Sequence, residues 1–304
     1  MNGVLVIDKP QGLTSHDVVN RVRRILGQRS VGHLGTLDPS ATGVLPIVTG
    51  SLTRLAQFYL QSEKSYEGVI RFGFSTDTYD AEGQPTAPAQ DVTLDAEKLR
   101  AVAAEFRGVI EQEPPPFSAK KIAGVPAYKL ARKKKEVALK PVQVEVKEFE
   151  ILAVEKDRAH FRARVATGTY LRSVAHDLGQ RMGCGAHLAW LRRTAVAEFT
   201  MEDAHTLEEL QNAAQQGSAE EIFVHPRKLL PQFPSVTATD ENAALIRHGR
   251  AVNLPELSRA RQVKVFYGQR ELIAIAVRVA GTLFHPEIVF TAEPAGYPAP
   301  REPR

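Results

Sequence analysis

Cysteine is almost absent from this chain. A single cysteine, Cys184, in 304 residues excludes an internal disulfide and any zinc site built from several cysteines. Long apolar runs are missing as well: residues 4–7 are far too short for a signal-peptide core, and no stretch approaches the ~20 apolar residues of a membrane span. We therefore expect a protein of the reducing cytoplasm that contacts no membrane.

Several motifs of nucleotide and metal chemistry are also absent. The chain has no Gly-x-x-x-x-Gly-Lys-Ser/Thr phosphate loop and no dinucleotide-binding glycine fingerprint, so nucleotide hydrolysis and dinucleotide redox chemistry have no support. A zinc deaminase needs a Pro-Cys-x-x-Cys pair, which one cysteine cannot supply. Asp77, Asp80 and Glu82 lie in a glycine-terminated turn, but their spacing lacks the remaining ligands of a calcium loop. We expect neither a cofactor nor a metal.

The charge is mildly basic and unevenly distributed. The formal net charge is +4, from 39 lysines and arginines against 35 acidic residues. An irregular segment opens at residues 114–116, and basic side chains with only Glu136 opposing them gather in it: Lys120, Lys121, Lys129, Arg132, Lys133, Lys134, Lys135 and Lys140. A second basic group falls on one helical stretch: Arg21, Arg23 and Arg24. Either group can contact phosphate or form an ordinary solvated face.

Apolar spacing predicts a mixture of helices and strands. Thr14 with Asp17 forms a capping pattern for a helix that ends at Leu26, before Gly27. Helical spacing continues over residues 52–60, over 99–106 ahead of Gly108, and over 170–182. Alternating or continuous apolar runs predict strands at residues 4–7, 44–48, 66–72, 142–146, 161–165 and 190–199. A sheet with flanking helices of this kind is an α+β fold with a mixed sheet.

A change in composition indicates a domain boundary after the first two thirds of the chain. Residues 217–221 are small and polar, which is typical of a linker. Beyond them, short strands are predicted at residues 263–266, 272–279 and 288–290. We therefore predict one domain over 1–216, a small β-rich domain over 225–292 and a disordered, proline-rich tail over 293–304.

The most informative segment is a polar turn before an apolar strand: Gly32-His33-Leu34-Gly35-Thr36-Leu37-Asp38-Pro39-Ser40-Ala41-Thr42-Gly43-Val44-Leu45-Pro46. Glycines allow backbone conformations closed to other residues, and Asp-Pro beside Ser and Thr is typical of turns. Asp38 is therefore predicted to lie on a shaped loop that faces solvent or a cleft. Taken alone, an Asp-Pro pair more often just starts a turn, but loops on rigid scaffolds also carry active sites.

This segment resembles the catalytic-loop signature of the TruB family of tRNA pseudouridine synthases, with Asp38 at the position of the family's invariable aspartate. Further blocks that resemble the same family follow in order along the chain, up to the predicted domain boundary. They are Leu5-Val6-Ile7-Asp8-Lys9-Pro10-Gln11-Gly12 with Thr14-Ser15, Lys64-Ser65-Tyr66, Thr76-Asp77-Thr78-Tyr79-Asp80-Ala81-Glu82-Gly83, Gly168-Thr169-Tyr170-Leu171-Arg172, Gly183-Cys184-Gly185-Ala186-His187-Leu188 and Leu191-Arg192-Arg193.

The resemblance implies a fold, a reaction and a substrate. The fold would be a pseudouridine synthase catalytic domain followed by a compact PUA-like RNA-binding domain. The reaction would isomerise uridine to pseudouridine at position 55 in the T-loop of tRNA, without a cofactor. The partner would be the T-arm of tRNA, with no DNA, guide RNA or protein partner, and the protein would act as a monomer. In that setting segment 110–140 is predicted to be an RNA-contacting insertion.

The implied reaction assigns catalytic roles to three residues. It breaks the N1–C1′ bond, turns the uracil and rejoins it through C5, so it needs a carboxylate near C1′ and a pocket for the detached base. Asp38 would be that carboxylate, as nucleophile or as C2′-proton base, and the sequence leaves both roles open. Arg172 would be the counter-ion that keeps Asp38 ionised. Tyr66 would stack on the base, with its hydroxyl placed for proton removal at C5.

Four further residues are predicted to bind the substrate. Tyr170 would lie beside the base or support Arg172, and Leu191 would form an apolar wall of the base pocket. His33 could insert into the RNA and replace the stacking that is lost when the base flips out. Lys9 would have a structural or a phosphate-contact role. Each has a plainer alternative, as a packing residue or as a turn residue satisfied by local hydrogen bonds.

Two other functions remain open at this stage. An N-glycosidase would share the activation at C1′, although glycosidases usually pair two carboxylates and this loop offers one. A protein that remodels tRNA folding without chemistry would also account for the basic segments. Loss of catalysis with retained RNA binding in an Asp38→Asn variant would favour the synthase over the remodelling protein.

Overall fold

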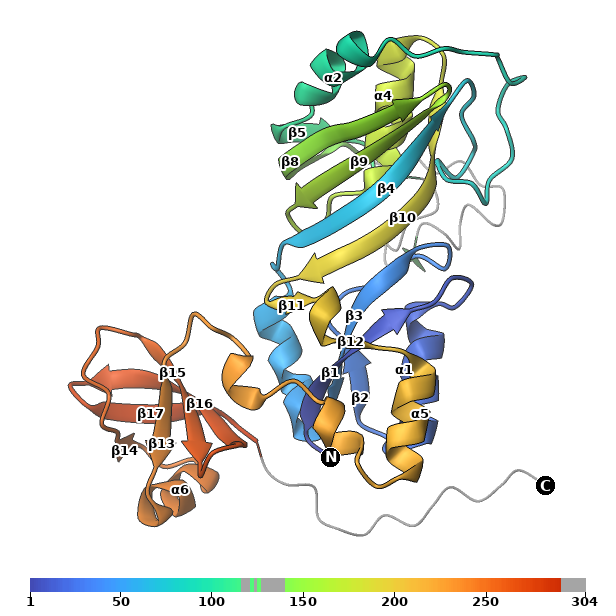
Figure 1. The fold of residues 1–304 in the computed structure, drawn as a ribbon. Coiled ribbons are helices and arrows are strands. Elements are labelled where there is room, and N and C mark those ends of the chain that lie inside the picture. The colour runs from blue at the N-terminus through green and yellow to red at the C-terminus, as the bar shows by residue number, and fades with distance from the viewer. Residues whose placement is uncertain (116–120, 123–124, 127–139, 291–304) are drawn as a thin grey trace.

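The structure, a computed structural model, describes residues 1–115, 121–122, 125–126 and 140–290. The side chains of the predicted lysine cluster up to Lys135, and the predicted tail 293–304, lie outside the described residues. Figure 1 shows a long twisted sheet with helices against it and a separate β-rich domain at its lower end. The predicted α+β class with a mixed sheet and a second, β-rich domain is confirmed.

The long sheet is built from strands that are far apart in the sequence. Its order is β12-β1-β3-β10-β4-β9-β8-β5, with β2 paired to β3 and β11 paired to β10. β3 and β10 run parallel, whereas β1 and β3, and β10 and β4, run antiparallel. The strands are β1 (Gly3–Lys9), β2 (Val31–His33), β3 (Thr42–Thr49), β4 (Lys64–Phe72), β5 (Gly108–Gln112), β8 (Val142–Glu155), β9 (Arg158–Val165), β10 (Ala186–Val196), β11 (Phe199–Thr200) and β12 (Ala204–His205). Outside this sheet, β6 (Lys121–Ile122) pairs with β7 (Val125–Pro126).

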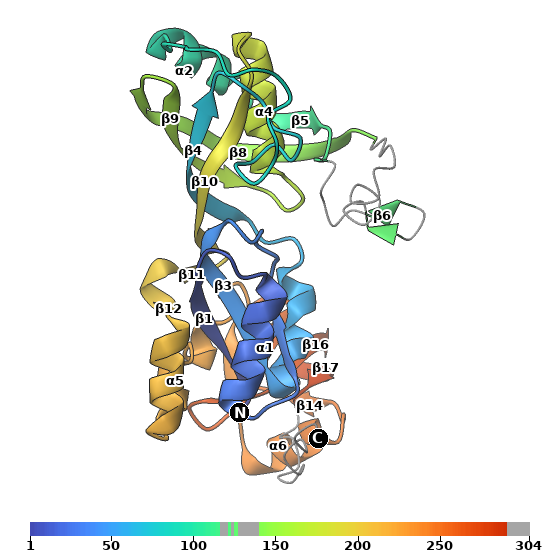
Figure 2. The ribbon, with the colours of Figure 1, turned by 90° about the vertical axis from the view of Figure 1, so that its right-hand side faces the viewer.

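The two faces of the lower half of this sheet are covered by different elements. Strand residues alternate between faces, so Leu5 and Ile7 pack with α1 (Ser15–Leu26) and α5 (Leu207–Gln215) in one core. Val4 and Val6 pack on the other face with η1 (Gly50–Tyr59). In Figure 2, α1 and α5 lie side by side in front of β1 and β3. In the upper half, α2 (Ala96–Ala104) and α4 (Leu171–Met182) pack on the strands β8, β9 and β4.

Local signals predict these helices well, with two differences. Thr14 and Asp17 form the expected capping box of α1, and Gly27 ends the helix in a left-handed conformation, with φ 59°. The segment predicted as a helix over 52–60 is a 3-10 helix over Gly50–Tyr59, which buries Leu52, Leu55 and Tyr59. The helix α2 ends at Ala104, before the predicted stop, and Gly108 opens the strand β5.

The second domain is a five-stranded sheet in the order β13-β15-β16-β17-β14, with one helix, α6 (Asp240–Arg247). Its strands are β13 (Ser235–Ala238), β14 (Val252–Asn253), β15 (Gln262–Tyr267), β16 (Glu271–Ala280) and β17 (Leu283–Val289). The segment predicted as a linker holds a short 3-10 helix, Ala219–Ile222, in which Ala219 is buried. The Val224 amide then donates a hydrogen bond of 2.8 Å to the carbonyl oxygen of Val4 in β1. The chain therefore still packs on the long sheet at Val224, before the first strand of the small domain begins.

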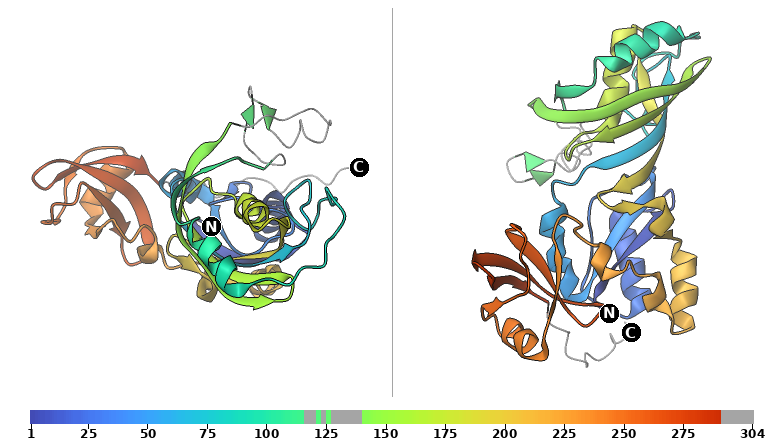
Figure 3. Two further views of the ribbon diagram at one scale, coloured as in Figure 1. Left: turned by 90° about the horizontal axis from the view of Figure 1, so that it is seen from above. Right: turned by 60° about the vertical axis from the view of Figure 1, so that its left-hand side comes forward.

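One apolar core joins the second domain to the first. Phe266, Leu272 and Ile275 of the small sheet pack in the same cluster as Leu52 and Leu55 of η1. The right-hand view of Figure 3 shows the small sheet beside the blue helix η1. Among the described residues, no helix is long and apolar enough to cross a membrane.

Candidate active site

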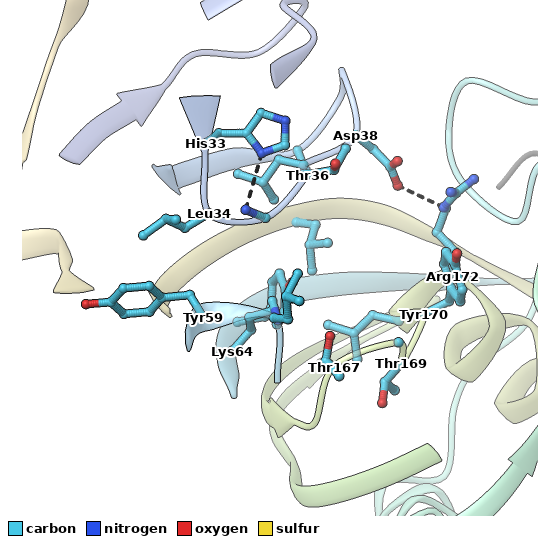
Figure 4. Close-up of a pocket in the computed structure, with 18 of the residues that line it drawn as sticks. His33, Leu34, Thr36, Asp38, Tyr59, Lys64, Thr167, Thr169, Tyr170 and Arg172 are labelled. Atoms are coloured by element: carbon cyan, nitrogen blue, oxygen red, sulfur yellow. Dashed lines mark hydrogen bonds and ion pairs between the residues drawn. The ribbon is translucent and has the colours of Figure 1, made fainter. Parts of the chain in front are cut away.

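A cleft of about 480 Å³ lies between the loop that follows β2 and the start of α4 (Figure 4). The loop supplies residues 34–38, η1 supplies Tyr59, and β4 supplies Lys64 and Tyr66. The segment before α4 supplies residues 167–170, and the first turn of α4 supplies Leu171 and Arg172. Six of the residues predicted for the site line this cleft: His33, Asp38, Tyr66, Tyr170, Arg172 and Leu191. Only Lys9 of the predicted set does not.

Asp38 and Arg172 form an ion pair across the cleft. Arg172 Nε lies 3.0 Å from Asp38 Oδ2, and the dashed line in Figure 4 marks this contact. The Arg172 side chain is only 7% exposed, whereas the Asp38 side chain is 41% exposed. A buried cation thus holds a carboxylate that an incoming substrate can reach. The ion pair fixes the direction of the carboxylate toward the cleft.

Arg172 contacts a second carboxylate that sequence reasoning did not assign to the site. Its Nη1 lies 3.4 Å from Oδ2 of the buried Asp80 and 3.3 Å from the carbonyl oxygen of Thr78. The other oxygen of Asp80 accepts hydrogen bonds from the Thr78 hydroxyl and from the Glu82 backbone amide. The planar guanidinium can serve both carboxylates because it presents several donors in a fixed fork. The sequence signals for Asp80 were its place in a glycine-terminated turn and in the Thr76–Gly83 block that resembles the family.

A second buried arginine, Arg193, holds the loop that carries Asp38. Its guanidinium donates to the carbonyl oxygens of Gly35 at 3.0 Å, Thr36 at 3.2 Å and Val44 at 2.8 Å. The pairing of β10 with β4 places Arg193 directly opposite Tyr66, whose hydroxyl is a further hydrogen-bond partner. Burial lowers the pKa of Arg193, yet an arginine stays protonated at neutral pH. Arg193 therefore ties the loop to the Tyr66 ring.

The backbone of the loop depends on a close approach at Gly43. A Cβ atom at Gly43, where φ is +102°, would lie 2.2 Å from the backbone oxygen of Arg193. Only glycine tolerates both this φ and this contact. The parallel pairing of β3 with β10, which brings Arg193 under the loop, therefore requires a glycine here.

The opposite side of the loop is held by Ser15 and Lys9. The Ser15 hydroxyl accepts from the Leu37 amide at 2.8 Å and donates to the Leu37 carbonyl at 3.1 Å. Lys9 Nζ donates to the carbonyl oxygens of Pro10, Leu13 and Pro39 at 2.8, 2.7 and 3.1 Å. Lys9 is fully buried, and burial lowers its pKa to about 8, although the nearby Asp38 carboxylate opposes that shift. Of the two roles left open for Lys9, the structure favours loop support over contact with phosphate.

The remaining cleft residues form its walls. Tyr66 is 9% exposed and presents part of its ring to the cleft. The Gly35 amide donates to His33 Nδ1 at 3.2 Å, and burial lowers the pKa of His33, so the ring is neutral at pH 7. Tyr170 is fixed by its backbone, which exchanges two hydrogen bonds with the Gln112 side chain. The cleft thus combines an accessible carboxylate, a neutral imidazole and flat rings.

Lys64 is a cleft residue that sequence reasoning did not single out. Its ammonium donates to the Ser62 carbonyl at 2.7 Å, and its stem packs beside Gly35. Burial, with the Arg193 cation as a second cause, lowers the pKa of Lys64 to about 8. Lys64 therefore adds a basic side chain to the lining of the cleft. Lys64 belongs to the Lys64-Ser65-Tyr66 block that resembles the family, but the sequence does not show that its side chain lines the cleft.

The acidic turn is a structural element. The Asp77 carboxylate accepts from the Gln84 amide at 2.8 Å, and Asp80 is paired to Arg172. Across the ranges that the structure describes, no group of three or more His, Cys, Asp or Glu side chains is placed to hold a metal ion.

Comparisons with known proteins identify the family of this chain. A model of the TruB family pseudouridylate synthase N-terminal domain matches residues 23–171, and a model of the tRNA pseudouridylate synthase B C-terminal domain matches residues 172–231. A protein of Solibacter usitatus (strain Ellin6076) named tRNA pseudouridine synthase B is 51% identical over 95% of this chain and 100% of its own length. The protein of that name from Aquifex aeolicus (strain VF5) is 40% identical over 93% of this chain and 98% of its own.

A solved structure shares most of the fold. A chain in the crystal structure of a Cbf5-Nop10-Gar1 complex aligns with a TM-score of 0.69 and 28% identity, over 95% of this chain and 85% of that chain. The match spans the long sheet and continues into the small domain, because it covers nearly the whole chain. By these matches, the chain belongs to the TruB family of pseudouridine synthases.

Proposed function

We propose that this enzyme isomerises uridine to pseudouridine at position 55 in the T-loop of tRNA. The observation that carries the proposal is the ion pair between Asp38 and Arg172 in a cleft that also presents Tyr66. The names of the relatives, tRNA pseudouridine synthase B, support tRNA as the substrate class. The cleft is large enough for one nucleotide, which must first leave its stacked position in the RNA.

The proposed reaction uses these groups in one sequence of bond changes. Asp38, oriented by its ion pair with Arg172, acts on the ribose as nucleophile at C1′ or as base at C2′, and the N1–C1′ bond breaks. The detached uracil is held by stacking on Tyr66 and by the Leu191 wall, and turns so that C5 faces C1′. The C5–C1′ bond then forms as the Asp38–C1′ bond breaks or, where Asp38 acted as base, as the proton returns to C2′. The C5 proton is then removed, and N1 takes up a proton. No electron acceptor or metal is needed for this balance.

The proposal also covers the partners. The enzyme would bind the T-arm as a monomer in the cytoplasm, without a guide RNA or protein subunit, and His33 would fill the space that the flipped base leaves. The basic side chains Arg21 and Arg24 on the helix α1, together with the segment 110–140, would contact phosphates. The small β-rich domain would contact the RNA as a PUA-like module.

The first experiment measures tritium release from C5-labelled uridine in a T-arm stem-loop. The wild type should release tritium, and Asp38→Asn should lose release while it keeps its affinity for the RNA. Asp77→Asn, in the nearby turn, is the matched control and should remain active. An N-glycosidase would instead liberate free uracil, and an RNA-remodelling protein would bind without either product. Full activity of Asp38→Asn would remove this carboxylate from the mechanism.

A further inference from the structure

A pair of stacked rings lies behind Arg172, outside the cleft lining. The rings of Tyr79 and His176 are parallel to within 14°, with centroids 3.8 Å apart. Both side chains are half-buried, and neither residue is among those that line the cleft. The pair joins the turn after β4 to the helix α4.

Tyr79 lies between the two turn residues that contact Arg172. The carbonyl of Thr78 and the carboxylate of Asp80 both approach Nη1 of the same guanidinium. The backbone of Tyr79 has a φ of +65°, a conformation that is rare for a bulky side chain. Its carbonyl accepts a hydrogen bond of 3.0 Å from the Leu188 amide, which fixes the turn to β10. A residue held in this conformation needs compensating contacts.

His176 supplies the contact from the helix that carries Arg172. It lies four residues after Arg172, so the two side chains project from the same face of α4. Within the described part of the chain, His176 Nδ1 is buried and has no hydrogen-bond partner. The position of the His176 ring is therefore set by stacking on Tyr79 and not by a hydrogen bond at Nδ1. Burial also lowers the pKa of His176, which favours the neutral ring.

We propose that Tyr79 and His176 form a clamp that positions Arg172 for its contact with Asp38. The stack holds the turn of Thr78 and Asp80 against α4, and that turn fixes the direction of the guanidinium. Tyr79 and His176 are positioning residues, because Arg172, and neither of the two rings, forms the ion pair with Asp38. The inference rests on the proposed function, since its readout is pseudouridine formation.

The test compares kcat and KM for the T-arm stem-loop in wild type, Tyr79→Leu, Tyr79→Phe and His176→Leu. A ring stack contributes enough free energy that its loss should lower kcat by about tenfold, with KM within about twofold of wild type. Tyr79→Phe keeps the ring and should retain wild-type kcat. Thermal unfolding of each variant shows whether the loss of activity follows merely from loss of folded protein.

The decisive experiment adds Tyr79→Leu to an Asp80→Asn variant and measures the rate of pseudouridine formation under single-turnover conditions. If the clamp acts through Asp80 and Arg172, the second substitution should cause little further loss, because coupled residues are not additive. Fully additive losses, an unchanged kcat in Tyr79→Leu, or failure of Tyr79→Phe to retain activity would each overturn the inference. No tritium release from the wild type would instead overturn the proposed function, and the inference with it.

Discussion

At the scale of single residues, the two buried arginines have different tasks. Arg172 faces carboxylates on both sides, Asp38 at the cleft and Asp80 in the turn. Arg193 donates to three carbonyl oxygens and contacts the Tyr66 hydroxyl, so neutral dipoles offset its charge. A buried charge is costly unless it is paired or hydrogen-bonded. Each arginine meets this requirement by fixing one half of the site: Arg172 fixes the carboxylate, and Arg193 fixes the loop and the ring.

The pKa of Lys64 leads to a prediction about RNA affinity. The ammonium is protonated below about pH 8 when the protein is folded, whereas an ordinary lysine keeps its proton to about pH 10.5. RNA phosphates favour the protonated form, so binding is coupled to proton uptake and weakens as the pH rises through 8. We expect the affinity for the T-arm stem-loop to fall by about tenfold between pH 7 and pH 9.

The measurement is RNA affinity by fluorescence anisotropy in the Asp38→Asn background, which prevents turnover. In the Lys64→Arg variant the side chain at this position stays protonated from pH 7 to pH 9, so the RNA affinity of the variant should stay level over that range. Lys64→Met should bind more weakly at pH 7 and show a flat profile. An equal pH dependence in wild type and Lys64→Arg would show that another group is responsible.

At the scale of elements, the start of α1 and the loop that carries Asp38 form one unit. Thr14 caps the helix, and the next residue, Ser15, binds both backbone groups of Leu37, one position before Asp38. We expect Ser15→Ala and Thr14→Ala each to lower the free energy of unfolding by about 1–2 kcal/mol. Only Ser15→Ala should also lower kcat, by about tenfold, because only this change frees the loop.

Urea unfolding and tritium release on the same preparations test this prediction. Thr14→Ala is the matched control, since it removes a neighbouring hydroxyl of similar energetic value without touching the loop. If the two variants lose the same amount of kcat, the activity follows general stability. The link between α1 and the loop would then have no part in catalysis.

The same elements show what the sequence can and cannot predict. The helix α1 was predictable because its cap, its apolar face and its terminal glycine are all local signals. The roles of Arg193 and Asp80 were not, because they depend on which strands pair and in which register. Arg193 meets Tyr66 only through the pairing of β10 with β4, two strands separated by more than half of the catalytic domain. For Lys9 the sequence left a structural and a phosphate-contact role open, because the burial of a charged side chain leaves no mark on its neighbours in the sequence.

At the scale of the whole molecule, one wall of the cleft is also part of the interface between the domains. Tyr59 of η1 lines the cleft, and its hydroxyl donates to Glu198 at 2.5 Å. The same carboxylate oxygen accepts from the amide of Leu230 at 2.8 Å, in the segment that leads into the small sheet. Phe58 of η1 packs edge-on against Phe233, with ring centroids 5.6 Å apart. The segment that leads into the small domain therefore packs against η1, which forms one wall of the cleft. This packing does not depend on any contact between the small domain and RNA.

Glu198 is the residue that tests this support. Glu198→Ala leaves the Tyr59 hydroxyl without its acceptor and leaves the Leu230 amide only its longer hydrogen bond of 3.3 Å to the Tyr59 hydroxyl, so it should lower the free energy of unfolding by about 1–3 kcal/mol. Glu198→Gln keeps an acceptor oxygen and should lose less, and the exposed Glu202→Ala should change little. Because one apolar core spans both domains, wild type should unfold in a single transition in urea. Two separate transitions in wild type, or equal effects of Glu198→Ala and Glu202→Ala, would show that the domains are energetically independent.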